Sequence, residues 1–153
     1  MILLHMDSLI PKLSILVTLV GFIVGYGSVM VIDIAGFLGR TSSYWTETTI
    51  RIHKITKPMI WVGMGILILG QGLLFSQGMI DINDAWVRGI IIIIMIMNGV
   101  FLSWVISPIL LAREAEGRAR ELLPRTLQIQ ITISFIISIA CWWSMMFLFV
   151  RGL

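Results

Sequence analysis

The segment GIIIIIMIMNGVFLSWVISPILLA, residues 89–112, places 24 consecutive residues without a charged side chain between Arg88 and Arg113. An α-helix rises about 1.5 Å per residue, so about 20 apolar residues cross the roughly 30 Å hydrocarbon core of a bilayer. This segment is therefore long enough to span a membrane as a helix, and it decides the fold class.

Three further segments lack charged side chains over 20, 23 and 25 residues, at 13–32, 58–80 and 126–150. The composition agrees, because 12% of the chain is charged whereas soluble domains contain about 25% charged residues. We therefore predict an all-α, membrane-embedded four-helix bundle that forms a single transmembrane domain over residues 1–153. The expected spans are 13–37, 58–77, 87–111 and 126–150.

Basic residues indicate the orientation of these spans. Eight of the 11 Lys and Arg residues lie in the connections 40–57 and 113–125. The positive-inside rule places both connections in the cytoplasm, so the helices run up-down-up-down and both termini lie on the outer side. We expect a multi-pass protein of a prokaryotic cytoplasmic membrane, with anionic lipid headgroups as partners of the basic side chains. Nucleic acid is not expected, because the basic residues are not interleaved with aromatic or polar readers.

Both connections carry signals of helical structure. In the second, three acid-before-base pairs at i,i+4 spacing favour an exposed helix, with Gly117 as its weak point. These pairs are Glu114–Arg118, Glu116–Arg120 and Glu121–Arg125. In the first, the run 41–43 after Gly39 is typical of a helix stop followed by an N-cap.

Small and polar residues within the spans indicate where the helices pack, because close approach of helix backbones stabilises association in lipid. Asn98 lies near mid-membrane, and we expect it to form an inward hydrogen bond with Gln71 or with a serine of the last span. A ligand or ion site at Asn98 is the alternative. The polar residues assigned to helix packing are Gln71, Asn98, Ser103 and Ser138.

Asp33 is an acidic residue at the cytoplasmic end of the first span, and an ionisable group in a membrane is a candidate functional residue. The structural interpretation is an ion pair with Arg51, Lys54 or Lys57. The alternative is binding of a substrate, a proton or a partner. We therefore predict a polar rim site composed of Asp33, Arg51, His53, Lys54 and Lys57.

The inventory of catalytic motifs is empty: no metal-ligand pair on a helix, no phosphate loop and no nucleophile elbow is present. We predict no enzymatic activity, no catalytic residue and no metal site. His5 and His53 belong to opposite membrane faces, so they cannot bind one haem iron together. Haem b held by His53 and a methionine stays an alternative.

The residues of 17–33, with glycines at 21, 25 and 27 and an acid at Asp33, resemble the first helix of a family of small prokaryotic four-helix integral membrane proteins without an assigned function. That helix typically reads Leu-His-x-x-Gly, followed by a Gly-x-Gly-Gly-Ala-Thr-type run that ends in Ser-Asp. The segments 97–102, 106–108 and 142–144 are similar to later helices of the family. Val17 and Thr18 stand where the family has Leu and His, so a haem or metal role of that His does not carry over. The resemblance implies the fold and no activity.

Three functional hypotheses follow from the sequence. The first is a non-catalytic accessory or structural subunit that packs against other membrane chains, or against copies of itself, in a larger complex. The second is a cytochrome-like membrane protein that binds haem b. The third is a small proton- or solute-coupled transporter subunit that uses Asp33.

Overall fold

The computed structural model describes the backbone of residues 2–152 and the side chains of residues 9–152. Within this part of the chain the structure is helical and contains no strand. Its elements are α1 (Ile2–Leu38), α2 (Ser43–Ser76), α3 (Ile82–Phe101), the π-helical turn η1 (Leu102–Ile106), α4 (Ser107–Ala115) and α5 (Arg125–Arg151).

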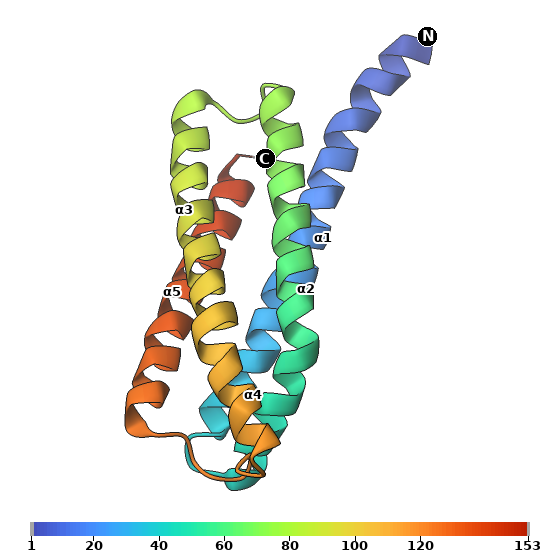
Figure 1. The fold of residues 1–153 in the computed structure, drawn as a ribbon. Coiled ribbons are helices and arrows are strands. Elements are labelled where there is room, and N and C mark those ends of the chain that lie inside the picture. Colours follow the sequence, from blue (N-terminus) through green and yellow to red (C-terminus); the bar gives the residue numbers. More distant parts are fainter. Residues whose placement is uncertain (1, 153) are drawn as a thin grey trace.

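The helices α3, η1 and α4 follow one another without a break, so the chain forms four long rods (Figure 1). Each rod is long and apolar enough to cross a membrane, as the uncharged gaps in the sequence predict. The apolar stretches are Leu9–Leu38, Ser43–Ser76, Ile82–Ala115 and Arg125–Arg151. The all-α, four-helix fold class is confirmed.

Glycines bring α1 and α2 into backbone contact. A Cβ atom on Gly63 of α2 would overlap the backbone of Gly25 in α1, and one on Gly21 would come within 2.7 Å of the Leu67 Cα. Such close approach increases van der Waals contact where lipid provides no hydrophobic driving force. The small-residue faces predicted for the first two spans are therefore the faces that meet.

Arg88 joins three helices at the end of the bundle where α2 leads into α3. Its side chain is 3% exposed and donates to the Gln71 Oε1 atom of α2 at 2.6 Å and to the Leu148 carbonyl of α5 at 2.6 Å. Gln71 is thus a packing residue as expected, although its partner is Arg88 and not Asn98.

Figure 1 shows the α1–α2 loop and the α4–α5 segment at the same end of the bundle. We call this the basic end, because it carries the connections 40–57 and 113–125. Ser42 is the N-cap of α2, with extended backbone (φ −131°, ψ 120°) and a side chain that accepts from the Trp45 N–H. The helix stop and cap predicted from residues 41–43 are confirmed.

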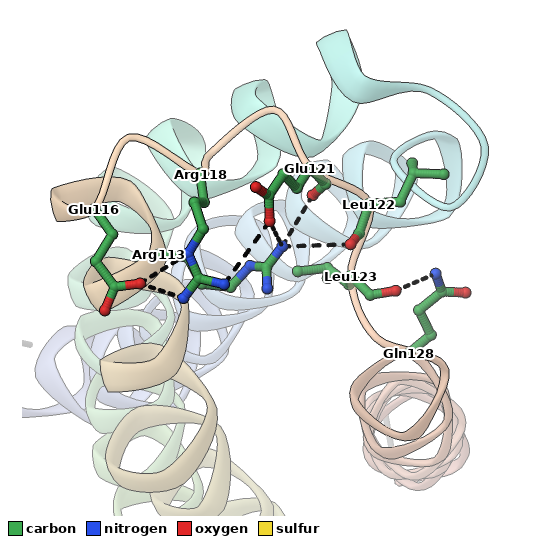
Figure 2. Close-up of polar contacts among 7 residues, drawn as sticks. All are labelled: Arg113, Glu116, Arg118, Glu121, Leu122, Leu123 and Gln128. Carbon is green, nitrogen blue, oxygen red and sulfur yellow. Dashed lines mark hydrogen bonds and ion pairs between the residues drawn. The ribbon is translucent and has the colours of Figure 1, made fainter.

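The helix expected through 113–125 is wrong. The helix ends at Ala115, and Gly117 has a φ of +72°, a conformation that turns the chain out of the helical path. The i,i+4 pairs cannot form in this loop. Instead, Arg118 pairs with Glu116 and with Glu121, the latter at 3.8 Å (Figure 2).

Candidate functional site

A cavity of about 260 Å³ lies in the half of the bundle nearer the basic end. All four rods contribute to its wall, with residues drawn from 29–40, 46–64, 95–110 and 123–142. Most of the lining surface is apolar, although 11 of the 30 lining residues are polar or charged. This combination is typical of small-molecule sites.

Aromatic packing closes the cavity toward mid-bundle and holds α5 against α1 there. The Trp142 ring occupies the space that a side chain on Gly25 would fill. Phe22 and Tyr26 pack on the same indole, with ring centroids 6.1 Å and 6.2 Å away.

The cavity opens sideways between α1 and α5. Phe37 and Ile136 both line it, yet they are 66% and 60% exposed on the outer surface of the bundle. In a bilayer this opening would face lipid rather than water. A molecule dissolved in the membrane could therefore reach the cavity directly.

Two polar atoms in the lining lack partners. The Asp33 Oδ2 and His53 Nε2 atoms are buried and form no hydrogen bond with any described residue. Buried polar atoms in folded proteins are normally paired, so each exception needs an explanation. Here both atoms belong to side chains that line the same cavity.

The two side chains also lie at similar heights. Near the basic end the Thr46 hydroxyl donates to the Gly39 carbonyl at 2.7 Å, which aligns α2 with α1. Asp33 precedes Gly39 by six residues and His53 follows Thr46 by seven. At about 1.5 Å per residue, each lies about 10 Å into the bundle from this contact.

Lys57 is held by the π-helical turn. The Ser107 N–H, which would bond the Ser103 carbonyl in an α-helix, donates instead to the Leu102 carbonyl, five residues back. The next residue, Pro108, has no N–H that could replace it. The Ser103 carbonyl is thus left without a helical donor, and it accepts from the Lys57 Nζ atom at 3.2 Å. The Trp61 indole N–H donates to the Ser103 hydroxyl at 3.0 Å on the same turn.

Arg40 closes the end of the lateral opening. Its guanidinium donates to the Thr132 hydroxyl of α5 and lies over the Phe37 ring, 5.8 Å from the centroid. Arg40 therefore connects Phe37 of α1 to Thr132 of α5 at the lateral opening. The acceptor of Arg40 is a neutral hydroxyl, and the acceptor of Lys57, the Ser103 carbonyl, is also neutral.

The ion pair expected for Asp33 is not formed. Arg51 pairs with Glu47 at 2.6 Å and Lys54 pairs with Glu114 at 2.7 Å, both at the surface. The structure therefore brings Asp33, His53 and Lys57 together at the cavity and leaves Arg51 and Lys54 outside it.

The other predicted polar residues divide between packing and lining. Asn98 and Ser134 exchange hydrogen bonds, with Ser134 Oγ donating to Asn98 Oδ1 at 2.6 Å and Asn98 Nδ2 donating to the Ser134 carbonyl at 3.1 Å. Of the two partners left open for Asn98, the structure pairs it with a serine of the last span and not with Gln71. Asn98, Ser103 and Ser138 also line the cavity.

Sequence reasoning missed the cavity residues Arg40, Trp61 and Thr132. A signal for Trp61 exists, because His53, Lys57 and Trp61 follow one another at four-residue spacing and so share one face of α2. Nothing comparable marks Thr132.

Few side chains near the cavity could bind a metal ion or a haem iron. No group of three or more His, Cys, Asp or Glu side chains suited to a metal ion occurs within the part of the chain that the structure describes. His53 lies in the cavity lining with Met64 and Met95. The side chain of His5 lies outside the described residues.

Comparison with protein-family models, curated proteins and solved structures found no match to this chain. The family resemblance of the first helix therefore stays a prediction.

Proposed function

We propose that this protein is a small multi-pass membrane protein that binds a small lipid-soluble molecule in the cavity between α1 and α5. One observation carries the proposal: Asp33 Oδ2 and His53 Nε2 are buried without partners beside an apolar cavity of about 260 Å³. A ligand that hydrogen-bonds both atoms would satisfy them while its apolar part fills the remaining volume.

The magnitudes favour an occupied cavity. An unsatisfied buried polar atom costs roughly 1–3 kcal/mol, and the cost is larger for a charged group. The cost of two such atoms in one cavity is a substantial fraction of the 5–15 kcal/mol that typically separates a folded from an unfolded protein. Binding energy from a ligand would offset this cost.

We further propose the membrane orientation in which the basic end faces the cytoplasm, with an up-down-up-down course and both termini outside. The excess of Lys and Arg at this end supports it. The test is labelling with a membrane-impermeant maleimide in a Cys141→Ala background. Arg118→Cys should react only in inside-out vesicles and Asn83→Cys only in right-side-out vesicles. The reverse pattern would refute the orientation.

The ligand is tested with a matched pair of glycine variants in α1. Gly36 lines the cavity, and a Cβ atom there would meet nothing closer than Thr49 Cγ2 at 4.0 Å, so Gly36→Leu adds a side chain into open space. Gly27 is exposed, does not line the cavity and has no atom within 4 Å of an added Cβ, so Gly27→Leu is the control.

Wild type and both variants are purified into lipid nanodiscs, and bound small molecules are extracted and identified by mass spectrometry. We expect a molecule that accompanies wild type and Gly27→Leu and is lost from Gly36→Leu. The proposal fails if no molecule is enriched over empty nanodiscs, or if Gly36→Leu retains it.

The same preparation distinguishes the hypotheses drawn from the sequence. A Soret absorption band lost in His53→Ala would favour the haem protein. Recovery with a second membrane chain in mild detergent would favour the accessory subunit. For the proposed ligand-binding protein we expect neither a Soret band nor recovery with a second membrane chain.

A further inference from the structure

We infer that the cavity selects lipid-soluble organic cations and that the Asp33 carboxylate is their counter-ion. This inference rests on the proposed ligand-binding function and adds the charge of the ligand to it. It comes from the distribution of charged and aromatic side chains around the cavity.

Asp33 is the acidic residue among the cavity-lining side chains. Its Oδ2 atom has no hydrogen-bond partner, and none of the ion pairs among the described residues includes Asp33. Acids within membrane spans normally pair with a cation or a backbone group, because an isolated charge there is costly. The cavity beside Asp33 is the place where such a cation can bind.

The neighbouring cations are already engaged. Lys57 is needed at the Ser103 carbonyl, which has no other donor in its helix, and Arg40 bridges to Thr132 while stacked on Phe37. Both bind neutral acceptors, so neither is in an ion pair with Asp33. A cationic ligand would therefore reach a carboxylate that the protein itself leaves free.

Aromatic rings provide the second element of cation recognition. Four aromatic side chains line the cavity: Phe37, Trp61, Phe135 and Trp142. The face of an aromatic ring attracts a cation, and the attraction increases when water is excluded. Arg40 already makes this interaction with Phe37, and Phe22 and Tyr26 pack on Trp142, so Trp61 and Phe135 are the remaining rings for a ligand.

An anionic ligand would meet the opposite situation. Lys57 and Arg40 would attract it, but it would be repelled by Asp33 and by the faces of the rings, and it would bond either basic group only by displacing it from its present acceptor. The lateral opening between Phe37 and Ile136 adds a preference for molecules that partition into lipid. A compact apolar body with one positive charge meets all of these conditions.

The test uses three probes of similar shape and different charge: benzyltrimethylammonium, its neutral carbon isostere neopentylbenzene, and the anion benzylsulfonate. Binding to the full chain in zwitterionic nanodiscs is measured by isothermal titration calorimetry, with empty nanodiscs subtracted for lipid partition. We expect the cation to bind at least about tenfold more tightly than the neutral isostere, as an ion pair with added ring contacts predicts. The anion is expected not to bind.

Asp33→Asn keeps the size of the side chain and removes its charge. It should remove most of the preference for the cation, with only the ring contribution left, and it should leave binding of the neutral isostere unaffected, which shows that the fold is intact. Asp33→Glu should retain the preference. Asp84→Asn is the control, because Asp84 pairs with Arg151 at the other end of the bundle.

The outcomes separate the inference from the proposed function. If the cation and the neutral isostere bind equally to wild type, or if Asp33→Asn keeps the preference, the charge selectivity is refuted while ligand binding stands. If none of the three probes binds to wild type, the charge selectivity is refuted as well, and the extraction from wild type, Gly27→Leu and Gly36→Leu decides the proposed function by itself.

Discussion

The ε-ammonium group of Lys57 in α2 lies 3.2 Å from the main-chain oxygen of Ser103 in the π-helical turn η1. This contact exists because the turn shifts the Ser107 N–H to Leu102, and because Pro108 cannot supply the next donor. The sequence thus creates an unsatisfied carbonyl within a membrane-length helix and places a lysine from another helix on it. Lys57 forms no ion pair with Asp33 among the described residues.

Lys57→Met is expected to destabilise the protein by about 1–3 kcal/mol, because it leaves the Ser103 carbonyl buried without a donor. The measurement is the midpoint of thermal unfolding in detergent. Lys54→Met is the matched control: its amine forms an exposed ion pair with Glu114 at 2.7 Å, and such pairs contribute about 0–1 kcal/mol.

A double variant tests the cause of this effect. Pro108→Ala restores an N–H five residues after Ser103, so it should reduce the cost of Lys57→Met. Additive effects of the two substitutions would contradict the role assigned to Pro108.

Gly63→Ala should destabilise the α1–α2 pair by about 1–3 kcal/mol, because the added methyl group overlaps the backbone of Gly25 and the helices must separate. Gly65→Ala, two residues along the same helix, meets no atom within 4 Å and should stabilise by about 0.5–1 kcal/mol through helix propensity. Unfolding in a mixed-detergent titration measures both changes. Equal effects would argue against close packing at Gly63.

The reciprocal hydrogen bonds between Asn98 and Ser134 join α3 to α5, and they can be measured in a double-mutant cycle. Alanine at both positions should reveal a coupling free energy of about 0.6–1.7 kcal/mol, the range found for polar contacts between membrane helices. Ser144 is exposed, so a cycle between Asn98→Ala and Ser144→Ala should give a coupling near zero. A coupling of the same size in both cycles would refute a specific contact.

The sequence predicts the rods and their contact faces because these depend on local properties. Charge-free length determines the spans, and the glycines at 21, 25 and 63 mark where backbones can meet. The cap at Ser42 follows from side-chain chemistry within one turn. Each of these features needs no knowledge of how distant helices are placed.

The site is less predictable because it depends on that placement. The sequence identifies Asp33, His53 and Lys57 as candidates, but it gives each basic residue near Asp33 an equal claim to pair with it. The structure instead uses Glu47, Glu114 and the Ser103 carbonyl as partners for those cations, and the last of these becomes available only through the π-helical turn. The cavity itself, whose wall comes from all four rods, has no local signature in the sequence.

Arg113 holds the loop between α4 and α5, and this leads to a final prediction about dynamics. Its side chain is 8% exposed and donates to the carbonyls of Glu121 and Leu122, each at 3.3 Å, as Figure 2 shows. Leu123, the next residue, lines the cavity. Since a hydrogen bond from a charged group contributes about 1.5–3 kcal/mol, Arg113→Met should raise the opening frequency of residues 116–123 by about tenfold or more.

Hydrogen exchange measured by mass spectrometry in nanodiscs reports this opening directly. Arg118→Met is the matched control, because the Arg118 side chain is about half exposed and its guanidinium bonds only the carboxylates of Glu116 and Glu121. Faster exchange confined to residues 116–123 in Arg113→Met, with faster release of any bound probe, would identify the loop as the cover of the cavity. If Arg118→Met accelerates exchange to the same extent, the buried guanidinium has no special role, and the surface ion pairs order the loop instead.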